Sequence, residues 1–181
     1  MPPRHDVPVG DAGWKPVPWP AASAVLLVTL WVLYCALTGE RWVPLLDGAN
    51  LLFHEAGHPI VGMFSERLMV YGGTFGQLAF PLAVYLEFRR QRDATGAAVG
   101  VIWLGQNGLN IGRYMADARA QALPLVGNGD RLHDWTEILS RWHLLRLDTV
   151  LGGLLRLSCV LLIMATLVWL LRQARRSNPI D

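Results

Sequence analysis

Residues 51–61 read LLFHEAGHPIV and lie within an apolar run at residues 42–64. On a helix, the spacing of His54 and His58 places both imidazoles on one face, one turn apart, where they can bind one Zn²⁺. Glu55 is then placed to act on a metal-bound water. Ionisable side chains in a membrane helix cost about 2.5–3.5 kcal/mol each on insertion scales. Three clustered polar groups in an apolar run therefore indicate a functional site.

The composition is typical of a membrane protein. The chain has 181 residues, enough for one domain; hydrophobic residues make up 52% and charged residues 17%, below the usual quarter. The formal net charge is +2 and the basic residues form short clusters, so nothing indicates binding to nucleic acid. Cys35 and Cys159 lie in apolar runs and are expected to pack as small hydrophobic residues rather than to form a disulfide or a metal site.

Apolar runs of helix length predict an all-α integral membrane protein with about five transmembrane helices. Residues 1–20 contain many prolines and are expected to form an extended tail, followed by a single polytopic domain at residues 21–181. The expected spans are residues 21–38, 43–63, 74–88, 94–113 and about 157–171, with a start near residue 150 as the alternative for the last. Five spans would place the termini on opposite sides of the membrane. Orientation stays open, because Lys and Arg are nearly balanced between the two sides.

Two segments between the spans have their own patterns. Residues 68–71 are apolar and are followed by two glycines, which predicts a short strand or loop after the His-Glu-x-x-His helix. Residues 114–147 form a polar loop that becomes amphipathic from Trp135, as in a helix at the membrane interface.

A catalytic zinc usually has three protein ligands and one open position for water, so a third ligand is needed. The expected topology places the polar loop on the same side as the histidine motif. Asp117 is the first choice because it follows the fourth span closely, and His133 or Asp134 is the alternative. Asp117 could instead pair with Arg113 on the surface, and Asp134 could cap a helix that has Glu137 three residues later.

Polar and small residues in the neighbouring spans are candidates for binding a peptide substrate. Gly73 and Gln77 lie in or before the third span, and Asn107 and Asn110 lie near the end of the fourth. Buried polar groups in lipid must find partners, so helix packing and interhelical hydrogen bonding explain the same residues equally simply.

The chain resembles the site-2 protease family of intramembrane zinc metalloproteases over residues 43–119. The similar features are His54-Glu55-Ala56-Gly57-His58, then Gly72-Gly73 with Gly76, Gln77 and Pro81, and Asn110 followed seven residues later by Asp117. The resemblance implies a zinc ion held by His54, His58 and Asp117, with Glu55 as general base. It also implies hydrolysis of peptide bonds within or beside the membrane.

These observations lead to one preferred function and two alternatives. The preferred function is a multi-pass membrane zinc metallopeptidase, surrounded by lipid, that cleaves a membrane protein or peptide. The alternatives are a catalytically silent membrane scaffold and a protein that binds or transports metal. The substrate, the identity of the membrane and the oligomeric state are left open.

Overall fold

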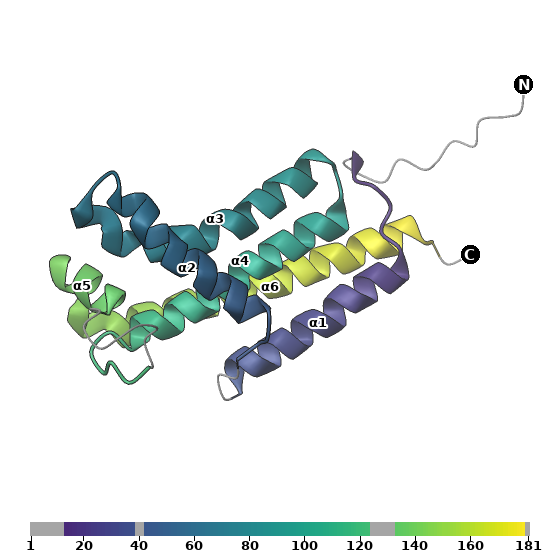
Figure 1. The fold of residues 1–181 in the computed structure, drawn as a ribbon. Coiled ribbons are helices and arrows are strands. Elements are labelled where there is room, and N and C mark those ends of the chain that lie inside the picture. Colours follow the sequence, from purple (N-terminus) through teal and green to yellow (C-terminus); the bar gives the residue numbers. More distant parts are fainter. Residues whose placement is uncertain (1–12, 39–41, 124–132, 180–181) are drawn as a thin grey trace, which may run out of the picture.

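The computed structural model describes residues 13–38, 42–123 and 133–179. This part of the chain consists of six α-helices, joined by irregular segments and the short 3-10 helices η2 (Glu66–Leu68) and η3 (Leu145–Leu147), and it contains no strand (Figure 1). The α-helices are α1 (Trp19–Leu37), α2 (Leu46–Gly62), α3 (Met69–Arg90), α4 (Ala94–Ala116), α5 (Asp134–Arg141) and α6 (Asp148–Ser177). The prediction of an all-α fold is confirmed for these residues.

The predicted strand at residues 68–71 is wrong, because these residues end η2 and begin α3. The glycines that follow serve the contact between α2 and α3 rather than a turn. A Cβ atom added at Gly72 would lie 2.4 Å from the Gly57 carbonyl oxygen, so only glycine allows the two backbones to approach this closely.

Helices α1, α3, α4 and α6 run between the two ends of the molecule, with α4 in contact with the other three (Figure 1). Helix α2 begins near the end of α1 and leads toward α5 instead of returning (Figure 1). Both ends of the described chain therefore meet: the Val17 N–H donates to Ser177 Oγ at 3.0 Å, and Asn178 Nδ2 donates to the Val17 carbonyl at 2.9 Å. The first and last described residues therefore lie at the same end of the molecule, unlike the arrangement expected from five successive spans.

Two helical segments of the described chain are long and apolar enough to cross a membrane, namely α1 and Leu145–Ser177, which contains α6. They correspond to the first and last of the predicted spans. Length and composition support membrane spanning for these two, whereas a set of five spans stays a prediction.

Asp47 is a buried carboxylate at the start of α2 that faces α4. Its Oδ1 accepts hydrogen bonds from Gln106 Nε2 and Asn110 Nδ2, both at 2.7 Å, and its Oδ2 accepts one from the Val43 N–H at 2.6 Å. Three donors thus satisfy a charge that would be costly to bury alone. Asn110 is a candidate for substrate binding, and its side-chain amide N–H group donates to Asp47 in this interhelical contact.

Asn50, one turn further along α2, extends the same network. Its Oδ1 accepts hydrogen bonds from Trp103 Nε1 at 2.7 Å and from Asn107 Nδ2 at 3.1 Å, and its Nδ2 donates to Gln106 Oε1 at 2.6 Å. These bonds hold the register between α2 and α4, and they also occupy the amide N–H group of Asn107. The network therefore positions the helix that carries both motif histidines.

We expect Asp47→Ala to lower the free energy of unfolding by about 2–4 kcal/mol, because buried donors on Gln106, Asn110 and Val43 lose their acceptor. Chemical unfolding in detergent measures the change. Glu66→Ala is the matched control, since Glu66 is exposed and its replacement should change stability by about 0.5 kcal/mol or less. Equal effects of the two substitutions would show that the network adds no net stability.

Candidate metal centre

The side chains of His54, His58 and Asp134 form a group whose potential ligand atoms all lie within 4.8 Å of one another. His54 Nε2 is 3.0 Å and His58 Nε2 is 3.3 Å from Asp134 Oδ2. In a tetrahedral zinc site with bonds of about 2.0–2.1 Å, ligand atoms are about 3.3 Å apart. The two distances to Asp134 are close to this value, and the group of two imidazoles and one carboxylate could hold a metal ion. This donor set suits zinc and also other divalent transition metals.

A backbone contact defines the tautomer of His58. Its Nδ1 lies 2.9 Å from the carbonyl oxygen of Met69, at the start of α3. A carbonyl can only accept, so Nδ1 carries a hydrogen, and Nε2 is the ring nitrogen that faces Asp134. Metal-binding histidines commonly use such a contact to orient the ring.

Gly73 lies directly beside the His54 ring. A Cβ atom at Gly73 would be 2.4 Å from His54 Cε1 and 2.5 Å from Nε2, closer than van der Waals contact allows. The sequence named Gly73 as a candidate for substrate binding, and the structure places it where it provides room for this imidazole. Gln77 is buried one turn further along α3, on the same face.

We expect Gly73→Ala to weaken zinc binding by about 10–100-fold, the usual effect of disturbing the support of a metal ligand. The methyl group would force the His54 ring out of position. Competition with a chromogenic chelator measures the affinity. Gly48→Ala is the control, because Gly48 is likewise a helical glycine, in α2, but a Cβ there meets nothing within 4 Å. An unchanged affinity in Gly73→Ala would contradict this role.

Asp134 is the first residue of α5, and two features hold it in place. Its N–H donates to the Tyr114 hydroxyl at 3.1 Å, and the Tyr114 ring lies 4.0 Å from the ring of His133, centroid to centroid. The apolar face of α5, formed by Trp135, Ile138 and Leu139, is buried in a cluster with Val70 of α3 and with Ile111 and Met115 of α4. The amphipathic pattern predicted from Trp135 is thus a helix packed on the protein.

Electrostatics favour an ionised Asp134. Burial alone would raise the pKa of its carboxyl group, but the contacts with His54 and His58 outweigh burial and hold this pKa below its ordinary value. A charged carboxylate facing two imidazole nitrogens is the state that a divalent cation requires.

Asp117, the first choice for the third ligand, lies outside this group, and the alternative Asp134 takes the position beside the histidines. The Asp117 carboxylate accepts hydrogen bonds from the N–H groups of Ala122 and Leu123, both at 3.0 Å, and its Oδ2 is 3.5 Å from His133 Nε2. Asp117 therefore holds the segment after α4 and lies beside His133.

His133, the other alternative ligand, is the N-cap of α5. Its Nδ1 accepts a hydrogen bond from the Thr136 N–H at 3.3 Å, so Nε2 carries the hydrogen that faces Asp117. Burial lowers the pKa of the His133 imidazole, which keeps the ring neutral at pH 7 and allows this acceptor role. The N-cap of α5, predicted at Asp134, is thus one residue earlier, at His133.

Tyr114 was not singled out from the sequence, and we expect Tyr114→Phe to weaken zinc binding about tenfold. Without the hydroxyl, the Asp134 N–H loses its acceptor and the ligand loses a positioning contact. Titration calorimetry measures the affinity. Tyr71→Phe, which removes a hydroxyl from a tyrosine stacked on Trp142, should leave the affinity unchanged. The same loss in both variants would indicate a general effect of repacking.

Glu55 is half-buried and adjoins the metal-binding group. It directly follows His54 in α2.

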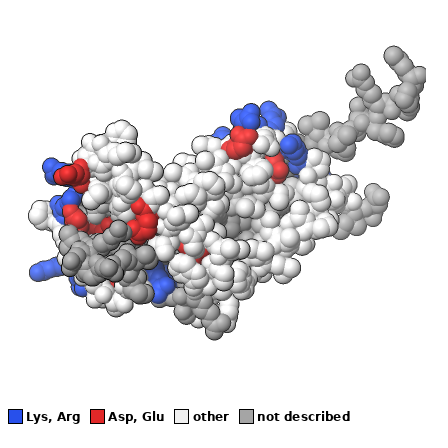
Figure 2. Space-filling view, in the orientation of Figure 1, with Lys and Arg blue, Asp and Glu red and all other residues white. Residues whose placement is uncertain are grey.

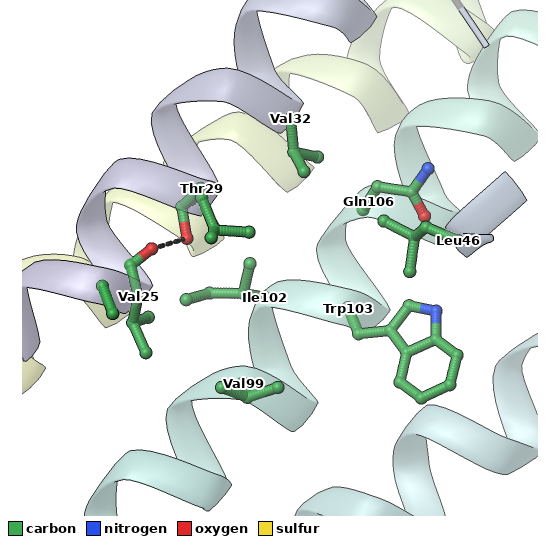
Figure 3. A pocket seen from close by; sticks show the side chains of 10 residues that line it. Val25, Thr29, Val32, Leu46, Val99, Ile102, Trp103 and Gln106 are labelled. Carbon is green, nitrogen blue, oxygen red and sulfur yellow. Dashed lines mark hydrogen bonds between the residues drawn. The ribbon is translucent and has the colours of Figure 1, made fainter. Parts of the chain in front are cut away.

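An apolar pocket of about 300 Å³ lies apart from this group, between α1 and α4 (Figure 3). Val25, Thr29 and Val32 line its α1 side, and the Thr29 hydroxyl donates to the Val25 carbonyl at 2.6 Å, so this side offers little polarity. Ile102 and Trp103 line the α4 side. The pocket holds no acid or base that could act in catalysis.

Comparisons with protein-family models, with curated proteins and with solved structures found no match. The resemblance to site-2 proteases therefore depends on the sequence motifs alone, and the aspartate beside the histidines is Asp134 rather than the Asp117 that the resemblance implies.

Proposed function

We propose that this chain is a multi-pass membrane protein that uses a zinc ion to hydrolyse peptide bonds in or next to the bilayer. The observation that carries the proposal is the group of His54, His58 and Asp134, whose potential ligand atoms all lie within 4.8 Å of one another, with both imidazoles 3.0–3.3 Å from the Asp134 carboxylate. Two imidazoles and one carboxylate are the protein ligands of many catalytic zinc sites, and they leave one position for water.

The two faces of α2 support a location in lipid. Asn50 and His54, on the inward face, are 3% and 9% exposed, whereas Leu52 and Ile60, on the outward face, are 66% and 54% exposed. A helix at the surface of a water-soluble protein has the opposite arrangement. An outward apolar face and an inward polar face suit a helix that is surrounded by hydrocarbon, and this pattern supports a metal-binding group at membrane depth.

The side chains then have distinct roles in hydrolysis. Zinc, when bound, polarises the peptide carbonyl and lowers the pKa of its water to about 7. The Glu55 carboxylate accepts a proton from the water whose oxygen attacks the carbonyl carbon. Protonated Glu55 then delivers this proton to the amide nitrogen as the carbon–nitrogen bond breaks. Asp134, positioned by Tyr114, keeps both histidines facing one point.

Cleavage of transmembrane peptides by the full chain in detergent micelles tests this proposal. We expect slow cleavage within the apolar segment, loss of cleavage with 1,10-phenanthroline, and recovery after addition of zinc. Zinc bound without any cleavage across a varied set of such peptides would contradict a peptidase. Metal uptake into proteoliposomes that persists in Glu55→Gln would support a transporter instead, and absence of metal would support a scaffold.

A further inference from the structure

A second cleft, of about 490 Å³, lies between α3, α4 and α6 near the end of the molecule that holds both termini. Its volume is in the range of small-molecule binding sites. It is lined by Trp14, Tyr85, Arg89, Ala97, Val101, Ala165, Thr166 and Trp169. None of these side chains belongs to the metal-binding group.

The segment before α1 forms one wall of this cleft and is tied to the helices on both sides. The rings of Trp14 and Trp169 make an edge-to-face contact with centroids 5.2 Å apart, and the Lys15 N–H donates to the Arg92 carbonyl at 2.8 Å. Further along, Val17 is bonded to Ser177. The wall is therefore part of the fold.

The cleft is polar at one end and apolar at the other. Arg89 lies at the end of α3, beside the turn into α4, whereas Val101 lies two turns into α4, about 10 Å further from this turn. Thr166 lies on the wall formed by α6, and its hydroxyl is bonded to the Leu162 carbonyl at 2.8 Å. A ligand that fits must carry its polar group at the turn and extend an apolar portion toward the middle of the helices.

The polar end selects for negative charge. Arg89 lies 6.0 Å from the centroid of the Tyr85 ring, while the nearby acid Glu87 is bound by Arg90 and Gln91 at 2.7 Å each. Within the described residues, no carboxylate pairs with Arg89. Figure 2 shows basic side chains at this end of the molecule, with acidic side chains among them. Tryptophan and tyrosine beside arginine are typical of the level of lipid headgroups.

We propose that this cleft binds one anionic phospholipid, with its phosphate on the Arg89 guanidinium and an acyl chain between α4 and α6. A guanidinium binds phosphate oxygens with two parallel hydrogen bonds, and basic side chains near a membrane favour anionic lipids. The proposal is independent of hydrolysis at the metal-binding group.

Lipid retention tests the proposal, with full-length protein delipidated in detergent and titrated with phosphatidylglycerol or phosphatidylcholine. Native mass spectrometry counts the bound molecules. We expect one phosphatidylglycerol to bind more tightly than phosphatidylcholine, and Arg89→Gln to weaken it about fivefold, as expected for one basic residue near a charged surface. Arg90→Gln is the matched control, because Glu87 already pairs with Arg90.

A second pair of variants tests the apolar end. Ala165→Phe fills the cleft and should weaken phosphatidylglycerol binding, whereas Val168→Phe, on the exposed face of the same helix, should not. Equal binding of the two lipids, or equal losses in Arg89→Gln and Arg90→Gln, would overturn the proposal. The proposal would also be overturned if the cleft retained free phosphate or oleate but no phospholipid. The readout requires no cleavage, so failure here leaves the proposed peptidase function standing.

Discussion

Glu55→Gln is expected to abolish measurable peptide hydrolysis while the zinc content remains about one ion per chain. Glutamine has nearly the size of glutamate but cannot accept a proton from water. General acid–base catalysis contributes about 10²–10⁴-fold to enzymatic rates, so the loss should be at least of that order. Since the ligand atoms belong to His54, His58 and Asp134, binding of the ion should persist. Initial rates and metal analysis on the same preparations measure both quantities.

Glu66→Gln is the matched control for this experiment. Glu66 is exposed in η2, outside the group, and its replacement should change neither rate nor zinc content. A Glu55→Gln protein that keeps more than a tenth of the wild-type rate would remove Glu55 from the role of base. Joint loss of hydrolysis and zinc would show that Glu55 supports the structure of the site.

Asp134→Ala is expected to reduce bound zinc from about one ion per chain to none at micromolar metal. Loss of a residue that supports a ligand costs about 10–100-fold in affinity, and loss of the ligand itself costs more. The removed carboxylate also carries the negative charge that faces both imidazoles at 3.0 and 3.3 Å. Metal analysis after gel filtration measures the content, and circular dichroism checks that the helices remain.

Asp117→Ala provides the comparison that decides between the two candidate ligands. Asp117 acts through His133 and the segment after α4, so its loss should weaken zinc binding about 10–100-fold, less than the loss of Asp134. If Asp117→Ala removed zinc and Asp134→Ala retained it, the first choice from the sequence would be correct and the arrangement described here would be wrong.

Much of the helical structure was predictable because its signals are local. The apolar runs that form α1 and α6 can be recognised as long apolar helices from their length and composition. The histidine spacing identifies one face of α2 in the same way. The strand at residues 68–71 failed because a glycine pair was interpreted as a turn. The need for Gly72 arises from the backbone of Gly57 on another helix, which no local pattern reveals.

The place of Asp134 beside the histidines was only partly predictable, because it depends on how α5 folds back on α4. Asp117 was preferred for its closeness to α4 in sequence, whereas Asp134 is 80 residues from His54 and reaches it through the buried face of α5 and the Tyr114 hydroxyl. A hydroxyl that accepts a backbone hydrogen bond leaves no recognisable motif. The sequence could name Asp134 as an alternative but could not rank it.

The sequence indicates which face of α2 carries the hydrogen-bond network around Asp47, but not which side chains of α4 this face contacts. Asp47, Asn50, His54 and His58 follow helical spacing, so they share one side of α2. The polar residues of α4 were expected to need partners in an apolar setting. Which side chains meet depends on the register between α2 and α4, and the structure supplies this register.

Anomalous diffraction from crystals of the full-length protein, recorded above and below the zinc absorption edge, tests the central claim most directly. We predict one zinc peak within about 2.0–2.2 Å of His54 Nε2, His58 Nε2 and an Asp134 carboxylate oxygen. A zinc-replete crystal with no peak there, or with a peak whose third protein ligand is Asp117, would contradict the account.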